Sequence, residues 1–196
     1  MNAAFEAPEV AWAPMVPILL VLGAGVIGIL VEAFAPRTAR RPVQLGLALV
    51  AIAGALVSIA ALWTDVRVDG GIEVLGGSLL VDGPTLALQG IVVLVGLVAL
   101  LVLADRTDAG EDAFAPSAAA VPGSDYEELA RRKGLAQTEA FPLVLFALGG
   151  MMIFPAAGDL LTLFIALEVL SLPLYLLSGM ARRRRLLSQE AGMKYF

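Results

Sequence analysis

The sequence of 196 residues contains no cysteine and no histidine. This absence excludes iron–sulfur clusters on cysteine, haem on histidine, zinc sites built from these residues, and catalysis by cysteine or a serine–histidine pair. Charge is scarce too, since 16% of the residues are charged, against about 25% in a soluble domain. The formal net charge of −5 argues against binding to nucleic acid.

Apolar residues make up 59% of the chain, and its mean hydropathy is +0.88. A soluble fold of this size would leave apolar patches exposed, so we expect lipid to surround much of the chain. A helix needs about 20 apolar residues to cross a bilayer core of about 30 Å. Such runs occupy residues 15–34, 45–63, 85–104, 141–154 (long enough when extended to 136–157) and 160–179. The prediction is an all-α, polytopic membrane helix bundle of five transmembrane helices, with the start of a sixth at residues 194–196.

The positions of the cations predict the orientation of the five spans. Eleven of the thirteen Lys and Arg residues fall in the loops after the first, third and fifth spans, and only Arg67 lies in the acidic loop after the second. We therefore place these three loops in the cytoplasm and the N-terminal segment, residues 1–14, outside it. This segment carries Glu6 and Glu9 rather than cations, which argues against a secretory signal peptide.

Residues 105–137 separate the three N-terminal spans, within residues 15–104, from residues 138–196. They are rich in Asp, Glu, Ala, Pro and Gly and cannot bury enough apolar surface to offset chain entropy. We expect a largely disordered, acidic cytoplasmic loop with a short helix at residues 126–133. A solvated linker is the simplest role for it, and a docking site for a cytoplasmic partner is the alternative.

One motif in the first span imitates a nucleotide site. Residues 23–28 read GAGVIG, which matches the dinucleotide-binding fingerprint GxGxxG. That fingerprint requires a strand that ends and a helix that begins at the glycines. Here the apolar run continues to Val31, so we expect these glycines to let neighbouring helices approach closely instead.

Glu168 is the strongest candidate for chemistry, because it lies halfway along the fifth span. An ionised side chain there costs about 3 kcal/mol on insertion scales, and such residues usually face a bundle interior or a water-filled cavity. Helical spacing places Ser171, Tyr175 and Ser178 on the same side as Glu168. Pro173 leaves the carbonyl of the residue next to Glu168 without its helical donor. The polar stripe favours ion or proton handling, and the alternative is a protonated Glu168 that joins two helices by a hydrogen bond.

Four other polar residues have weaker signals. Lys194 follows Ser188, a candidate N-cap, and is either an interfacial lysine that reaches water or a buried one. Glu32, near the cytoplasmic boundary, is predicted to be a hydrated residue at the end of its span. We assign Gln89 to helix packing and Asp159 to helix capping.

The strongest motif begins at Asp159. Residues 159–175 read DLLTLFIALEVLSLPLY, and the four arginines 182–185, the stretch LLSQEA and the stretch KYF follow. Over residues 159–196 the sequence resembles subunit N of bacterial NADH–quinone oxidoreductase, respiratory complex I. The first three spans fit that family in number and orientation. The resemblance implies an antiporter-like subunit with two inverted helical repeats, of which the first begins at the fourth span, and it implies that this chain is its N-terminal portion.

The resemblance also implies roles for two residues. Glu168 corresponds to a glutamate of the family's fifth helix and Lys194 to a lysine of the sixth. Both are held to take part in proton translocation, the glutamate by modulating the proton affinity of a lysine on the seventh helix. The implied partners are the other membrane subunits of complex I and the lipid of the bacterial cell membrane. No cofactor is expected in this chain, since NADH, FMN, iron–sulfur clusters and quinone belong to partner subunits.

The expected function is that of a proton-translocating membrane-arm subunit of NADH–quinone oxidoreductase, which couples quinone reduction to proton pumping through a buried Glu/Lys pair. Two other interpretations stay open. One is a subunit of a related multi-subunit sodium/proton antiporter or membrane-bound hydrogenase. The other is a purely structural assembly subunit in which a neutral Glu168 joins two helices.

Overall fold

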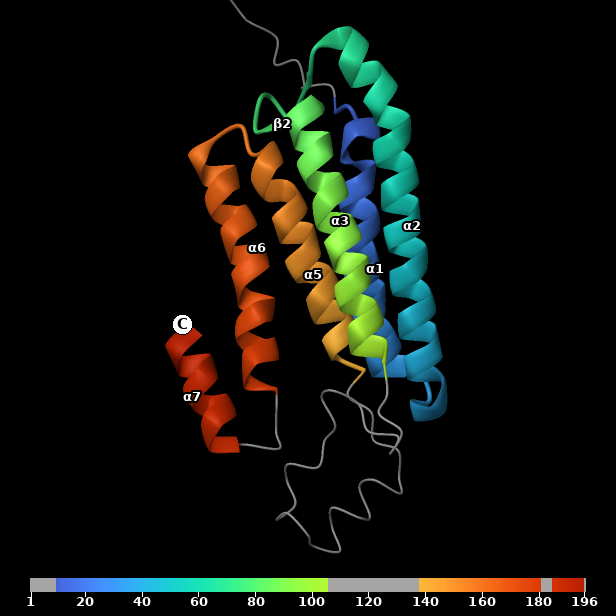
Figure 1. Ribbon diagram of the computed structural model, residues 1–196, viewed down its shortest axis with the longest axis vertical. Coiled ribbons are helices and arrows are strands. Elements are labelled where there is room, and N and C mark those ends of the chain that lie inside the picture. The colour runs from blue at the N-terminus through green and yellow to red at the C-terminus, as the bar shows by residue number, and fades with distance from the viewer. Residues whose placement is uncertain (1–9, 106–137, 181–184, 196) are drawn as a thin grey trace, which may run out of the picture.

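The computed structural model describes residues 10–105, 138–180 and 185–195. The described chain is a bundle of roughly parallel and antiparallel helices with a small hairpin at one end (Figure 1). Its helices are α1 (Val16–Phe34), α2 (Arg37–Asp69), α3 (Gly83–Ala104), α5 (Ala140–Ile153), α6 (Leu160–Gly179) and α7 (Arg185–Tyr195), with 3-10 turns η1 (Ala13–Met15) and η3 (Phe154–Ala156). The hairpin consists of strands β1 (Ile72–Val74) and β2 (Leu79–Val81).

The all-α membrane bundle is confirmed. In the part of the chain that the structure describes, four helical segments are long and apolar enough to cross a membrane: Ala13–Phe34, Arg37–Val68, Gly83–Ala104 and Leu160–Gly179. The fourth expected span differs, because α5 has 14 residues and begins at Ala140 rather than near residue 136. It continues into η3, so the apolar helical stretch is Ala140–Ala156 and stays shorter than the others.

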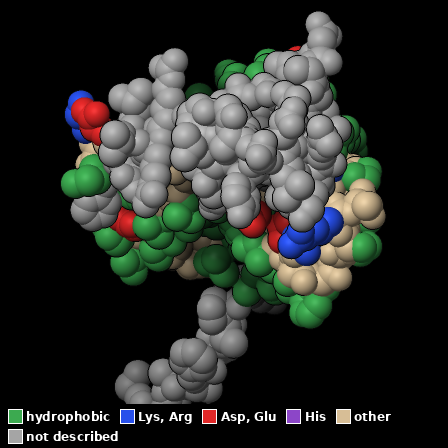
Figure 2. Space-filling model, turned by 90° about the horizontal axis from the view of Figure 1, so that it is seen from below, with side chains coloured by type: hydrophobic (Ala, Val, Ile, Leu, Met, Phe, Trp, Pro, Cys, Tyr) green, Lys and Arg blue, Asp and Glu red, His purple; other side chains and the backbone are tan. Residues whose placement is uncertain are grey.

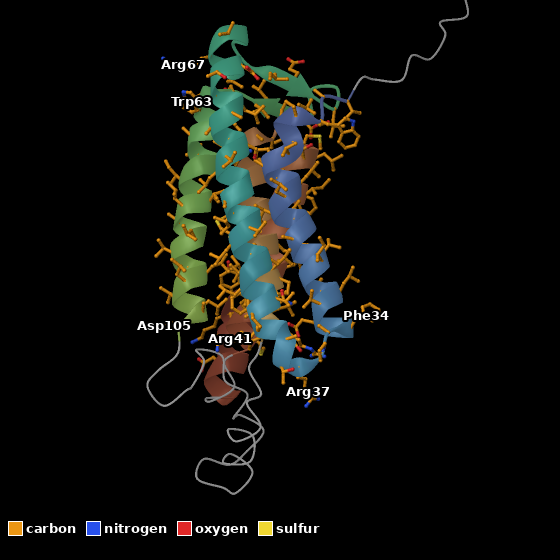
Figure 3. The ribbon with its side chains drawn as sticks, turned by 90° about the vertical axis from the view of Figure 1, so that its right-hand side faces the viewer. Phe34, Arg37, Arg41, Trp63, Arg67 and Asp105 are labelled. Carbon is orange, nitrogen blue, oxygen red and sulfur yellow. The ribbon has the colours of Figure 1, made fainter. Side chains whose placement is uncertain are left out.

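Helix α2 is longer than the apolar run that predicted it. It has 33 residues where the sequence predicted 19, from residue 45 to 63. At about 1.5 Å per residue it measures about 50 Å, more than a bilayer core of about 30 Å. Figure 3 shows Arg37 and Arg41 near one end of α2, and Trp63 and Arg67 near the other.

Helix α5 occupies the middle of the bundle and packs against α1, α2, α3 and α6 (Figure 1). Glycines make these contacts close. A methyl group on Gly25 would lie 3.3 Å from the ring of Phe146, and one on Gly28 would lie 3.1 Å from Pro142. The expectation that the GAGVIG glycines serve helix packing is therefore confirmed for two of its glycines, whereas Gly23 faces open space.

The β1–β2 hairpin was not expected from the sequence. It pairs Ile72 with Val81 and turns through Gly76 and Gly77, both at positive φ, which glycine adopts without steric cost. Two short apolar-rich runs, IEV and LLV, on either side of a glycine pair were the available signal. The hairpin rests on the connection between η3 and α6, where the Gly158 N–H donates to the Ser78 carbonyl over 2.8 Å.

The end of the bundle that holds Phe34, Arg37, Arg41 and Asp105 is labelled in Figure 3. There Arg41 donates to the last carbonyl of α3, at Ala104, over 2.7 Å. Seen from this end, the described charged side chains gather at a few places beside a largely hydrophobic flank (Figure 2). The assignment of this end to the cytoplasm stays a prediction. The expected loop at 105–137, apart from Asp105, and its helix at 126–133 lie outside the described residues.

Candidate functional site around Glu168

Helix α6 positions Glu168, and Asp159 starts that helix. The Asp159 carboxylate accepts a hydrogen bond from the Thr162 backbone N–H over 2.6 Å, which confirms the predicted cap. This bond holds the pKa of Asp159 below its ordinary value of 3.8, because it favours the charged carboxylate. The helix then runs unbroken from Leu160 to Gly179, through Pro173.

The two sides of α6 differ in what they contact. Ala166 and Pro173 are buried, and they share the side that packs against α5 because seven residues make almost two full turns. Glu168 lies about 160° away around the helix from Leu170, which is also on the α5 side. Tyr175, seven residues after Glu168, contacts Tyr195 of α7 edge to face, with ring centroids 5.0 Å apart. Glu168 therefore lies on the α7 side of α6, and so does the predicted polar stripe.

Glu168 is half-buried, and within the described ranges it has no hydrogen bond or ion pair. Further along the stripe, Ser178 donates to the Tyr175 carbonyl over 2.8 Å. Glu168 stands at one end of the stripe and is its one ionisable carboxyl group, whereas Ser178 at the other end is hydrogen-bonded to its own helix.

Lys194 is the second expected site residue. Its Nζ pairs with Glu190 on the same helix over 2.6 Å, and its side chain is 75% exposed. Helices α6 and α7 run antiparallel, because Tyr195 meets Tyr175 while Gly192 approaches Gly179. The structure thus places Lys194 on the helix that packs on the same side of α6 as Glu168, about two turns away from Glu168 along α6. It does not bring the two charges into contact.

The N-cap expected at Ser188 is wrong. Helix α7 begins at Arg185, so Ser188 lies within it. Arginine and leucine are strong helix formers, and the residues before Ser188 therefore extend the helix.

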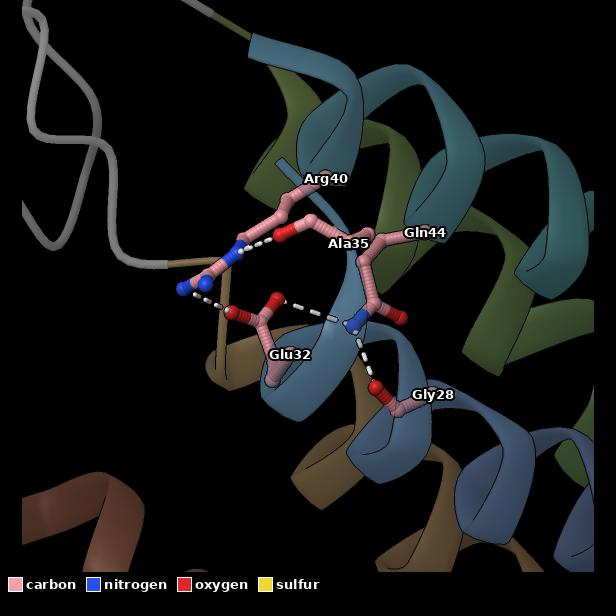
Figure 4. A network of polar contacts seen from close by, with 5 residues as sticks. All are labelled: Gly28, Glu32, Ala35, Arg40 and Gln44. Carbon is pink, nitrogen blue, oxygen red and sulfur yellow. Dashed lines mark hydrogen bonds and ion pairs between the residues drawn. The ribbon is translucent and has the colours of Figure 1, made fainter. Parts of the chain in front are cut away.

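The expectation for Glu32 as a hydrated residue is also wrong. Its side chain is 13% exposed, and Arg40 pairs with it over 3.4 Å. Gln44 Nε2 donates both to Glu32, over 2.9 Å, and to the Gly28 carbonyl, over 2.7 Å (Figure 4). Helix α2 begins three residues after α1 ends. The chain therefore folds back at once and brings Arg40 and Gln44 over Glu32.

Gln89 has more than the packing role expected for it. It is fully buried, which confirms that role, and its Nε2 donates to the Met152 carbonyl over 3.0 Å. One turn earlier, Thr85 donates to the Pro155 carbonyl over 3.1 Å. These side chains of α3 hold the end of α5, where Pro155 has no N–H to offer. Over the described residues, no group of three or more acidic side chains is arranged to hold a metal ion.

Comparison with known proteins addresses the part of the chain that holds both site residues. Residues 157–196 match the family model described as "NADH:quinone oxidoreductase/Mrp antiporter, TM". A protein of Beutenbergia cavernae named NADH-quinone oxidoreductase subunit N is 63% identical over 98% of this chain. The chain is a homologue of subunit N. A subunit N of Streptomyces griseus is 50% identical over 98% of the chain, and one of Rhodococcus opacus is 47% identical over 100% of it.

The resemblance to subunit N that the motif around Glu168 suggested is therefore confirmed. The similarity extends over the first three spans as well, since the alignments cover nearly the whole chain. Together with the four long apolar helices, it identifies a multi-pass membrane protein. The chain spans 38%, 36% and 39% of the length of these three subunit N relatives.

Proposed function

We propose that this chain forms part of a proton-translocating membrane subunit of NADH–quinone oxidoreductase, in which Glu168 is a proton-handling carboxyl group. The observation that carries the proposal is the position of Glu168: in the middle of an apolar helix, half-buried, and without a hydrogen bond or ion pair among the described residues. A carboxyl group in this position is costly in free energy, and ionisable residues inside membrane helices therefore usually serve a function. The family-model match, which includes both Glu168 and Lys194, supports the same conclusion.

The proposed mechanism is electrostatic. A cation on the α7 side of α6 favours the ionised form of Glu168, and Glu168 in turn favours the protonated form of that cation. Lys194 is the candidate cation of the described chain, and in this structure it pairs with Glu190 instead. A change in the separation between α6 and its neighbours on that side alters both proton affinities, so a proton is taken up or released. Redox events in other subunits drive that change.

The chain has no cysteine or histidine to hold a redox centre, so electron transfer belongs elsewhere in the proposed complex. Its partners are the other membrane subunits of the oxidoreductase, and NADH, FMN, iron–sulfur clusters and quinone are bound by partner subunits. The proposed location is the bacterial cell membrane with the N-terminus outside the cytoplasm, which the distribution of Lys and Arg along the sequence supports. In this sense the chain belongs to an enzyme without containing its catalytic redox site.

The test is the substitution Glu168→Gln in the intact oxidoreductase in inverted membrane vesicles. The matched control is Glu73→Gln, which changes an exposed glutamate on strand β1. We expect Glu168→Gln to lower the number of protons translocated per NADH oxidised, and Glu73→Gln to leave it unchanged. An unchanged ratio in Glu168→Gln, with normal assembly, would refute the proposal.

The structural alternative makes Glu168 a neutral hydrogen-bond donor between helices. The absence of a hydrogen bond at Glu168 among the described residues argues against it. Infrared spectroscopy separates the two: the proposal predicts an ionised-carboxylate band that is lost in Glu168→Gln. The antiporter alternative predicts that proton translocation depends on sodium, whereas the proposal predicts the same ratio in potassium and sodium buffers.

A further inference from the structure

The closest approach of two helix backbones near Glu168 occurs at Gly150, on α5. A Cβ atom added at Gly150 would meet the backbone of α6: it would lie 2.8 Å from the Leu170 Cα atom and 2.9 Å from the Val169 carbonyl carbon, and it would also meet the Leu170 nitrogen. Ordinary contacts of a Cβ atom begin at 3.4 Å. Gly150 therefore lets α6 lie closer to α5 than any other residue would allow.

The other close glycines of the bundle meet side chains instead. A Cβ atom at Gly96 would lie 2.7 Å from Leu148 Cδ1, and one at Gly149 would lie 2.6 Å from Leu22 Cγ. A leucine side chain can turn to another rotamer, whereas a helix backbone can only move as a whole. An alanine at Gly150 thus displaces a helix, and an alanine at Gly96 displaces a side chain.

The helix that moves is α6. Helix α5 is enclosed by α1, α2, α3 and α6, whereas α6 packs mainly on α5 and α7. Many of the large apolar side chains of α6 are exposed, among them Leu161 at 70% and Leu176 at 59%. The contact at Leu170 lies about 160° around the helix from Glu168. An outward displacement of α6 therefore carries Glu168 toward its α7 side.

We propose that Gly150 is a positioning residue, which sets the distance between the Glu168 carboxyl group and the charges on the α7 side of α6. This inference rests on the proposed function of Glu168. To relieve the contact, α6 has to retreat by more than about half an ångström. At an effective dielectric constant of about 20, a shift of about half an ångström changes the protonation constant of a carboxyl group about 6 Å from a cation by about 1.5-fold.

The test compares three alanine variants of the intact oxidoreductase: Gly150→Ala, Gly96→Ala and Gly90→Ala, the last at a position with open space around it. The pH midpoint of the Glu168 carboxyl band is measured by infrared difference spectroscopy against Glu168→Gln. We expect Gly150→Ala to shift the midpoint by an amount equal to about a 1.5-fold change in the protonation constant. Gly96→Ala and Gly90→Ala keep the wild-type midpoint. An unshifted midpoint in Gly150→Ala overturns the inference.

A second comparison separates backbone contact from side-chain contact. Leu148→Ala removes the atoms that an alanine at Gly96 would meet, so Gly96→Ala is expected to cost less stability in the Leu148→Ala background than in the wild-type protein. Truncation of the Leu170 side chain does not reduce the stability cost of Gly150→Ala, because the contact there is with backbone atoms. Relief by Leu170→Ala would contradict the inference.

Two measures keep the outcome unambiguous. Ala166 is fully buried on the α5 side of α6, so Ala166→Val presses α6 outward through a side chain. If Gly150→Ala does not accumulate in membranes, Ala166→Val is expected to shift the Glu168 band, and an unshifted band overturns the inference. The proposed function fails separately, when Glu168→Gln itself leaves proton translocation unchanged. If Glu168→Gln lowers proton translocation as expected, while the Glu168 band is unshifted in Gly150→Ala and Ala166→Val, only the positioning role of Gly150 is refuted.

Discussion

Two buried glutamines allow the contribution of the Glu32 network to the free energy of unfolding to be measured, because one of them serves as a reference for the other. Gln44 and Gln89 are both fully buried, and each leaves its Oε1 atom without a hydrogen-bond partner among the described residues. Each donates through Nε2 to one backbone carbonyl. The difference is that Gln44 also donates to the Glu32 carboxylate, over 2.9 Å. Replacing both with leucine isolates that one bond.

The expected magnitudes follow from the bonds that each substitution removes. Gln89→Leu removes a hydrogen bond to a carbonyl, which lowers the free energy of unfolding by about 0.5–1.5 kcal/mol. It also removes the buried, unpaired Oε1 atom, which raises the free energy of unfolding by about 1–3 kcal/mol. Its stability should change little or rise. Gln44→Leu has the same gain and loss and in addition loses a bond to a charged group, worth about 1.5–3 kcal/mol. Gln44→Leu should therefore be less stable than Gln89→Leu by about 1.5–3 kcal/mol.

The assay is unfolding of the protein in mild detergent, by heat and by titration with sodium dodecyl sulfate. A third variant, Gln44→Glu, places a second carboxylate beside Glu32, and like charges about 4 Å apart repel by about 4 kcal/mol at an effective dielectric constant of about 20. Its loss of stability should exceed that of Gln44→Leu at pH 7 and shrink on acidification. Equal stabilities of Gln44→Leu and Gln89→Leu would refute the reasoning, because the Glu32 bond would then contribute nothing.

Two further predictions concern the helix ends and crossings. Gly28→Ala should lower the thermal midpoint, since its Cβ would lie 2.8 Å from Gln44 Oε1 and 3.1 Å from Pro142, whereas Gly23→Ala, which meets no atom within 4 Å, should not; similar midpoints in the two variants would show that the α1 crossing is loose. Asp159→Ala should lower the midpoint at pH 7 by removing the cap of α6. Because the pKa of Asp159 is lowered on folding from 3.8, its contribution is present above that pH and is lost as the pH falls through the lower folded-state value. A difference between wild type and Asp159→Ala that persisted unchanged at the most acidic pH would contradict this assignment.

The sequence predicted best those features that depend on a single helix. The cap at Asp159 depends on one side chain and the backbone three residues on, and the prediction is confirmed. The apolar runs likewise located the long helices, and apart from the two ends of α2 the predicted ends lie within a few residues of the observed ones. The predicted ends of α2 were too short because charged residues also form helices beyond the membrane, where length is not limited by lipid.

Several features that depend on two helices were missed or misjudged, although the packing roles of Gly25, Gly28 and Gln89 were predicted. Glu32 was expected in water, but Gln44 and Arg40 cover it from the next helix. A pattern along one helix does not show which residues of its neighbour face it. Gly150 was missed for the same reason, because its role comes from a backbone atom of Leu170, and backbone atoms carry no sequence signal.

Glu168 could be found from the sequence, whereas its surroundings could not, because they belong to other helices. Its cost in lipid is a property of one residue type at one depth, so a single chain reveals it. What the carboxyl group does depends on both sides of α6. On the α5 side, the Gly150 contact leaves the helix no room to move inward. On the α7 side, Glu190 holds Lys194 about two turns from Glu168. Because α6 cannot shift toward α5, the proton affinity of Glu168 follows any change in the charges on the α7 side or in their distance from its carboxyl group. For that reason the substitution at Gly150 is expected to change the proton affinity of Glu168, although it lies on the opposite side of the helix.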